Sequence, residues 1–88
     1  MKTIYKYPIE VTDKQTVKLP IDSLVVSVLN QNGQLVIYAL VDTEETETEE
    51  KTIRIFGTGH PVDVEEFDYN FLGSVMMGEF VWHIFAAS

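Results

Sequence analysis

Apolar and polar residues alternate with a period of two along most of the chain, which is the pattern of half-buried β-strands. Prolines or glycines follow several of the alternating stretches, as expected where a strand ends. Seven segments fit the pattern: Lys2–Tyr7, Gln15–Leu19, Ser23–Leu29, Gln34–Val41, Lys51–Phe56, Phe71–Met77 and Glu79–Phe85.

Two connections carry hairpin signals. Asn32 and Gly33 separate the two segments richest in β-branched residues, and both residue types tolerate the positive φ of a tight hairpin turn. Gly78 separates the last two segments in the same way. Gln34–Val41 is apolar on both faces, so it is expected in the middle of a sheet or beneath a partner subunit.

These elements predict an all-β single domain over residues 1–88, built as a small antiparallel β-sandwich or barrel-like meander of about seven strands. At most one short helical turn is expected, over Val64–Phe67. Asp63 and Glu66 have the three-residue spacing of a capping box at its start.

Residues 42–50 carry six carboxylates and no apolar side chain. Because clear strands flank them, we expect a solvated hairpin loop. A calcium-binding loop is the alternative, but such loops need a glycine at the bend and this segment has none.

The chain is short and has no cysteine, so neither a disulfide nor a thiolate zinc site stabilises it. A domain of 88 residues buries only about 60–65% of its unfolded surface. Hydrophobic residues make up 45% of the chain, and self-association would bury more of them. We therefore expect a homo-oligomer.

Fourteen acidic residues against six basic ones give a net charge of −8. This excess argues against binding to nucleic acid, because phosphate contacts need several Lys or Arg side chains. The opposite alternative is an acidic surface that imitates nucleic acid and binds a basic partner. The apolar stretches are too short for a membrane helix, and the N-terminus lacks a signal-peptide pattern. We therefore expect a cytosolic protein that has no membrane partner.

The segment from Gly57 to His60 reads Gly-Thr-Gly-His and is the first candidate binding site. The backbone amides of Gly57 and Gly59, the Thr58 hydroxyl, the His60 ring and nearby Arg54 could hold a phosphate or a nucleotide. The alternative is that both glycines only supply positive φ where the chain leaves the sheet.

Among the aromatic residues, Tyr38, Phe56 and Trp82 are the candidates for stacking on a base, because they occupy doubly apolar or loop-adjacent segments. The other aromatic side chains are expected in the core. The basic residues lie in or beside the strands of the first two-thirds, so a locally positive pocket is possible despite the global charge. The same lysines could instead only protect strand edges.

Catalysis is not predicted. His60 and His83 could pair with Asp63, Asp68 or Glu79, but no hydrolase or metalloprotease spacing is present. We therefore predict no catalytic residues, no metal site and no cofactor.

The opening MKTIYKYP, the segment LVDTE, the stretch RIFGTGHP and the ending FVWHIF resemble a family of small uncharacterised proteins encoded by bacteriophages and prophages. The resemblance runs along most of the chain. It implies a phage-encoded, soluble accessory protein located in the cytoplasm of the host bacterium.

The expected function is a non-catalytic binding protein, a small oligomeric sponge that sequesters a phosphorylated nucleotide signal, cyclic or of ADP-ribose type, in counter-defence. The first alternative is an acidic inhibitor that binds a host protein. The second is a structural or accessory role in the virion. The expected ligand-binding residues are Arg54, Gly57, Thr58, Gly59, His60, Tyr38, Phe56 and Trp82.

Overall fold

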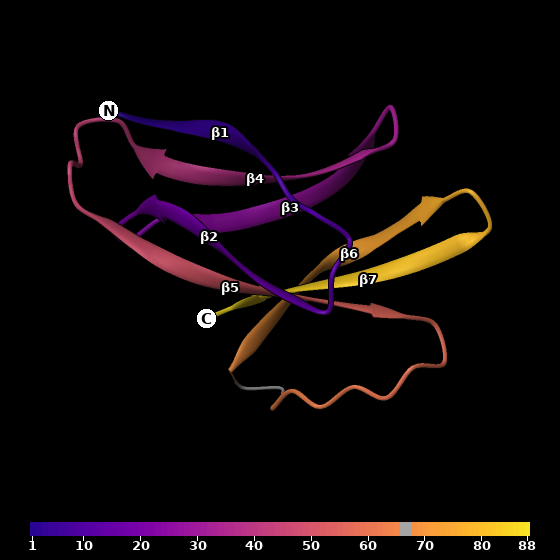
Figure 1. Ribbon diagram of the computed structural model, residues 1–88. Coiled ribbons are helices and arrows are strands. Elements are labelled where there is room, and N and C mark those ends of the chain that lie inside the picture. The colour runs from indigo at the N-terminus through magenta and orange to yellow at the C-terminus, as the bar shows by residue number, and fades with distance from the viewer. Residues whose placement is uncertain (66–67) are drawn as a thin grey trace.

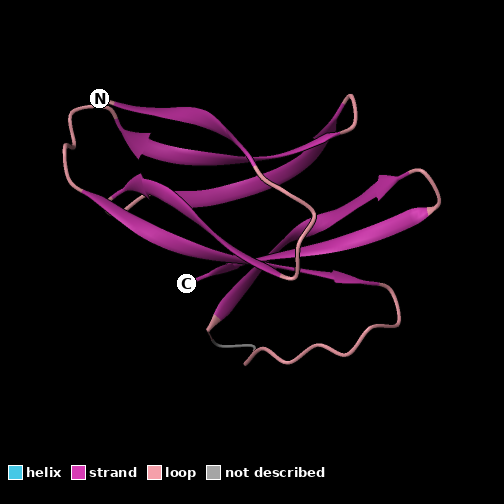
Figure 2. Cartoon of the chain, viewed as in Figure 1, coloured by secondary structure: helices cyan, strands magenta, loops and turns pink. Residues whose placement is uncertain are grey.

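A computed structural model describes residues 1–65 and 68–88 (Figure 1). The described residues form seven strands and no helix (Figure 2). The strands are β1 (Lys2–Pro8), β2 (Lys14–Pro20), β3 (Leu24–Gln31), β4 (Gln34–Asp42), β5 (Thr48–Gly57), β6 (Tyr69–Met77) and β7 (Phe80–Ala87). The predicted all-β fold of about seven antiparallel strands is confirmed.

Two antiparallel sheets make an open sandwich. Sheet A has the strand order β1-β4-β3, and sheet B has the order β2-β5-β7-β6. The chain crosses between the sheets after β1, β2 and β4, whereas β3–β4 and β6–β7 are hairpins within one sheet. In Figure 1 sheet A lies above sheet B, and the long connection after β5 lies below sheet B.

The two hairpin turns form where the sequence predicts them. Asn32 and Gly33 have φ values of 53° and 89°, and the Asn30 side-chain oxygen accepts a hydrogen bond from the Gly33 amide at 2.9 Å. Gly78 has a φ of 62° between β6 and β7. Positive φ at these positions twists the turn in the sense that antiparallel strands require.

The core lies between the sheets and is almost entirely aliphatic. β4 is the central strand of sheet A, as predicted, and its alternate residues from Leu35 to Val41 are buried. From sheet B, Ile53 and Ile84 are fully buried and face them. The core comprises Ile9, Leu19, Val25, Leu35, Ile37, Ala39, Val41, Ile53, Ile55, Ile84 and Ala86.

The predicted hairpin loop over residues 42–50 is wrong in two respects. β4 and β5 belong to different sheets, so the segment is a crossover and not a hairpin. β5 begins at Thr48, and its Glu49 and Glu50 pair with Leu19 and Lys18 of β2. Residues 43–50, five of them glutamates, are all exposed. Backbone pairing with β2 therefore overrides the low strand propensity of glutamate.

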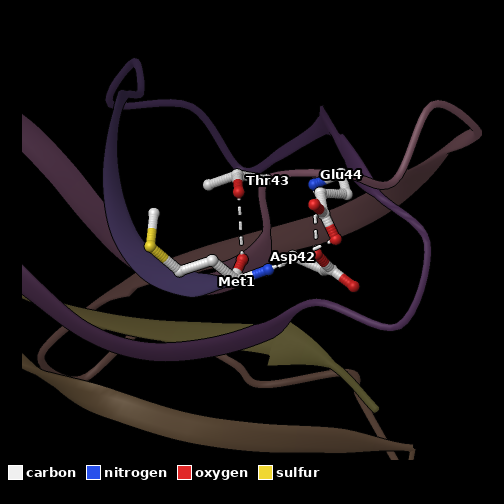
Figure 3. Close-up of polar contacts among 4 residues, drawn as sticks. All are labelled: Met1, Asp42, Thr43 and Glu44. Atoms are coloured by element: carbon white, nitrogen blue, oxygen red, sulfur yellow. Dashed lines mark hydrogen bonds and ion pairs between the residues drawn. The ribbon is translucent and has the colours of Figure 1, made fainter.

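The crossover is tied to the start of the chain (Figure 3). The Met1 amino group lies 3.4 Å from an Asp42 carboxylate oxygen, and the Thr43 hydroxyl donates to the Met1 carbonyl at 3.1 Å. The Glu44 amide donates to Asp42 at 3.0 Å. This amide, together with the positive Met1 amino group, holds the pKa of Asp42 below its ordinary value.

The helical turn expected over Val64–Phe67 includes residues 66 and 67, so that prediction and the capping role of Glu66 lie outside the described residues. Asp63 is described, and it contacts Arg54 of β5. Within the described residues, no helix is long and apolar enough to cross a membrane.

Candidate functional site

The Gly-Thr-Gly-His segment is a tight turn at the end of β5. The His60 amide donates to the Gly57 carbonyl at 3.1 Å, which closes a four-residue turn. Gly59 occupies its third position with a φ of 86°. A type II turn requires positive φ at this position, so a glycine here is explained by backbone geometry.

Gly57 serves a different purpose, because it is still in β5 and does not have positive φ. A Cβ atom at Gly57 would lie 2.8 Å from the His60 ring and 3.2 Å from Trp82. The interpretation that both glycines only supply positive φ is therefore wrong for Gly57. Its missing side chain makes room for the imidazole to lie against the strand.

Arg54 is held in place from three sides. Its Nε donates to the Asp13 carbonyl at 3.0 Å, and its Nη2 lies 2.6 Å from an Asp63 carboxylate oxygen. The guanidinium also lies 5.0 Å from the Phe56 ring centre, within cation–π range. The Arg54 side chain is 15% exposed, whereas the Asp63 side chain is 73% exposed.

The arginine also changes the acidity of its partner. The hydrogen bond from Arg54, reinforced by its positive charge, holds the pKa of Asp63 below the ordinary value of 3.8. Asp63 is therefore ionised at neutral pH and neutralises the guanidinium.

A hollow of about 360 Å³ surrounds this pair, and we name it the Arg54 hollow. Strand β5 and the loops before β2 and after β5 supply its walls. The lining residues are Asp13, Arg54, Ile55, Phe56, His60, Pro61 and Asp63.

A second hollow, of about 440 Å³, opens on the other side of His60, and we name it the Trp82 hollow. Phe80 and Trp82 stack there with ring centres 5.7 Å apart and planes 20° apart. Glu79 adds a carboxylate and Thr58 a hydroxyl. The hollow is therefore suited to a flat ring that carries hydrogen-bond donors.

The structure brings most of the predicted site residues together around His60. Arg54 and Phe56 line one hollow, Gly57, Thr58 and Trp82 line the other, and His60 lines both. Gly59 shapes the turn and lines neither hollow.

Tyr38 is not part of this site. It belongs to β4 in sheet A, where it pairs with Lys6 and Ser27, and it lines neither hollow.

Seven residues of the two hollows were not among the predicted site residues: Asp13, Ile55, Pro61, Asp63, Glu79, Phe80 and Val81. Phe80 could have been found from its alternation with Trp82, which places both rings on one face of a strand. Asp13 comes from the loop before β2 and Asp63 from the loop after β5, and no periodicity in the sequence indicates where such loops fold.

His83 was predicted in a core or interface strand, and the structure surrounds it with hydroxyl groups. The Ser74 hydroxyl lies 2.6 Å from Nδ1, and the Thr58 hydroxyl lies 2.8 Å from Nε2. The register of β6 and β7 places Ser74 directly opposite His83. Since Ser74 provides a hydroxyl at Nδ1, where hydrolase triads have a carboxylate, it supplies no charge to stabilise an imidazolium.

Carboxylate and histidine side chains do not gather into a metal site within residues 1–65 and 68–88. No group of three or more of them is close enough to share an ion. The segment 42–50 lies wholly within the described residues and therefore gives no support to the calcium alternative.

The chain matches a protein family described as a domain of unknown function (DUF7352) over residues 1–88, and it belongs to that family. No functionally curated protein and no solved structure matches it.

Proposed function

We propose that this protein is a non-catalytic binding protein that holds a small phosphorylated nucleotide across the two hollows. The observation that carries the proposal is the position of His60, which lines both hollows and separates an arginine from a stacked aromatic pair. The base would stack on the Trp82 side, and the phosphate would contact Arg54.

The arginine supports the phosphate end. Packing on Phe56 and the bond from Nε to the Asp13 carbonyl fix the plane of the guanidinium. A fixed guanidinium suits phosphate, whose oxygens accept parallel N–H bonds. Asp63 now takes one of these bonds. Because its side chain is mostly exposed, a ligand phosphate can replace the carboxylate without unfolding the site.

The aromatic pair supports the base end. Stacking of a base on an aromatic side chain contributes about 1–3 kcal/mol and tolerates every base. The Glu79 carboxylate can accept a bond from an exocyclic amino group. The Thr58 hydroxyl, which already contacts His83 Nε2 at 2.8 Å, has capacity for a further hydrogen bond.

The biological setting extends the same proposal. The resemblance to bacteriophage and prophage proteins supports a phage-encoded sponge in the cytoplasm of an infected bacterium. Its ligand would be a cyclic or ADP-ribose-type nucleotide of the host defence. Sequestration needs only binding, which fits a site with an arginine and stacked rings.

Thermal-shift screening against a panel of phosphorylated nucleotides tests the proposal. A ligand that binds only the folded state at one hundred times its Kd stabilises it by about 2.7 kcal/mol. For a domain of this size, that raises the Tm by about 10 °C or more. Inorganic phosphate and the free nucleosides are the control ligands. The proposal is wrong if saturating concentrations of every nucleotide leave the Tm unchanged.

A second candidate function rests on a separate surface. Residues 43–50 are exposed, and an acidic inhibitor would use this segment to dock on a basic host protein. Neutralising its glutamates would then abolish activity, whereas changes in the two hollows would not. The glutamates concerned are Glu44, Glu45, Glu47, Glu49 and Glu50.

A further inference from the structure

The side of sheet A that faces away from sheet B is apolar and exposed. Ile4 of β1 and Leu24 of β3 are each 56% exposed, and both pair with Leu40 of the central strand. Val26, at the bulge in β3, and Leu29 are also about half exposed. We name this surface the outer face of sheet A.

One end of this face is already covered by the chain itself. The Lys6 ammonium group donates to the Gln31 side chain at 2.9 Å, which carries the lysine stem across β4. Val36 is only 2% exposed although it alternates with core residues. The more exposed part is the end that contains Ile4, Leu40 and Leu24, although Leu29, paired with Val36 at the other end, is also 47% exposed.

Charged residues border this open end. Lys2 pairs with Asp42 across β1 and β4, and both line a hollow of about 300 Å³ together with Leu24, Leu40 and Asp22. The cation therefore lies on the β1 side of the face, whereas Asp22 precedes β3 on the opposite side.

We propose that this face binds the same face of a second copy of the chain, around a two-fold axis that runs along β4. Stacked sheets keep their strands within about 30° of one another. Such an axis places β1 of one copy over β3 of the other. Ile4 then faces Leu24, Leu40 faces Leu40, and Lys2 faces Asp22.

This arrangement also places Lys2 opposite Asp22. Asp42 of β4 meets Asp42 of the other copy on the axis, and in each copy the Met1 amino group, 3.4 Å away, and the paired Lys2 offset its charge. A two-fold axis across the strands would instead stack β1 on β1 and bring Lys2 and Lys6 of each copy onto the lysine-bearing strand of the other. Like charges in contact oppose association. The axis along β4 therefore suits the charges of this face, and the copy of the chain supplies both complementary edges.

The size of the face limits the surface area that the dimer can bury. Its three strands, spaced about 4.8 Å apart, are no more than nine residues long. The interface is therefore at the low end of specific contacts, about 600 Å² per copy. Because buried area does not by itself fix the Kd, dimerisation must be measured over a concentration series.

Sedimentation of the intact chain from about 1 μM to 1 mM gives the first test. The expected result is a monomer–dimer equilibrium that Leu24→Glu weakens about tenfold or more, because the dimer would bury the new charge. Met76→Glu is the matched control, since Met76 is 71% exposed on β6 of the other sheet, and it should leave the Kd within about twofold. Circular dichroism melting checks that both variants fold.

The absence of cysteine allows a second test of the geometry. An equal mixture of Ile4→Cys and Leu24→Cys should oxidise to a covalent dimer faster than either variant alone, since facing positions of two sheets can be bridged. The cysteines of two identical copies lie on opposite sides of the axis, beyond the reach of about 7 Å that a disulfide needs.

Three results would overturn the proposal: a monomer at every concentration, equal weakening by the Met76 control, or single variants that cross-link as fast as the mixture. None of these outcomes bears on nucleotide binding in the two hollows, because both hollows lie at sheet B and not on this face. The dimer and the nucleotide site can therefore fail independently.

Discussion

Arg54 and Asp63 form the shortest ion pair described in the structure, with 2.6 Å between Nη2 and a carboxylate oxygen. The arginine is mostly buried and the aspartate mostly exposed. The aspartate is thus the movable partner. In the proposed function it occupies the position of the ligand phosphate, so it competes with the ligand from within the chain.

Asp63→Asn is therefore expected to increase affinity for a phosphorylated nucleotide. Removing the competing charge frees the guanidinium, and a gain of about threefold to tenfold follows from the strength of charge-assisted hydrogen bonds at an exposed position. Calorimetric titration measures the Kd. Glu65→Gln is the control for a general loss of negative charge, and Arg54→Gln should weaken binding by at least the same factor. Equal affinity gains in the Asp63 and Glu65 variants would refute competition.

The same pair makes stability depend on pH in the acid range. The pKa of Asp63 is below 3.8 in the folded chain, because Arg54 stabilises the carboxylate. A depressed pKa gives stability that is fully present above the unfolded value and lost as the pH falls through the folded one. The unfolding free energies of the wild type and Asp63→Asn should therefore converge as the pH falls below about 3.8. Urea titrations between pH 7 and pH 2.5 test this, and a gap that is the same at every pH contradicts it.

Gly57→Ala is expected to push the His60 ring off β5. The added methyl group would lie 2.8 Å from the imidazole and 3.2 Å from Trp82, so at least one side chain must move. Overpacking of this kind costs about 1–3 kcal/mol, less if His60 can swing outward. Trp82 is the only tryptophan, so its fluorescence reports the change directly.

Gly59→Ala is the matched control for that variant. Its Cβ would have open space, and its cost comes from a φ of 86°, about 1–2 kcal/mol. Denaturant unfolding should show a loss for both variants, and the emission of Trp82 should change only in Gly57→Ala. A shifted emission in both would show that the turn as a whole, and not the contact with His60, sets the environment of Trp82.

Substitutions at Phe80 and Ile84, which lie on the same strand, are expected to distinguish a loss of nucleotide binding from a loss of stability. Ile84 is fully buried, so Ile84→Ala should destabilise the fold by about 2–5 kcal/mol. Phe80 is 64% exposed and stacks on Trp82, so Phe80→Ala should cost less than about 1 kcal/mol in stability while weakening nucleotide binding several-fold. Parallel urea and calorimetric titrations check both. Unchanged affinity in Phe80→Ala would remove the aromatic pair from the site.

The sequence predicts the strands well because each is defined by local alternation and local turn chemistry. Asn32, Gly33 and Gly78 need positive φ, and the hairpins form around them. The crossover at residues 43–47 was mistaken for a hairpin because pairing partners are not a local property. Glu49 and Glu50 enter a strand because β2 offers hydrogen bonds to their backbone.

Only part of the candidate site could be predicted, again because contacts between distant residues are not a local property of the sequence. Residues 54–60 lie close together because they are consecutive at one strand end, and Trp82 joins them because β7 pairs with β5 up to Gly57. Asp63, the partner of Arg54, comes from a loop without hydrophobic periodicity. Only its spacing from Glu66 was informative, and that spacing predicted a helix cap. Tyr38 was expected at the site from its apolar strand, but the sheet order places that strand in the other layer.

The chain has one arginine and one tryptophan, and they lie in different hollows. Their side-chain N–H signals in a nitrogen-15 NMR spectrum therefore report the two hollows separately. Titration with the nucleotide that gives the largest thermal shift should move both signals with the same Kd. A nucleotide that binds while leaving either the Arg54 or the Trp82 signal unmoved would contradict a ligand that spans His60.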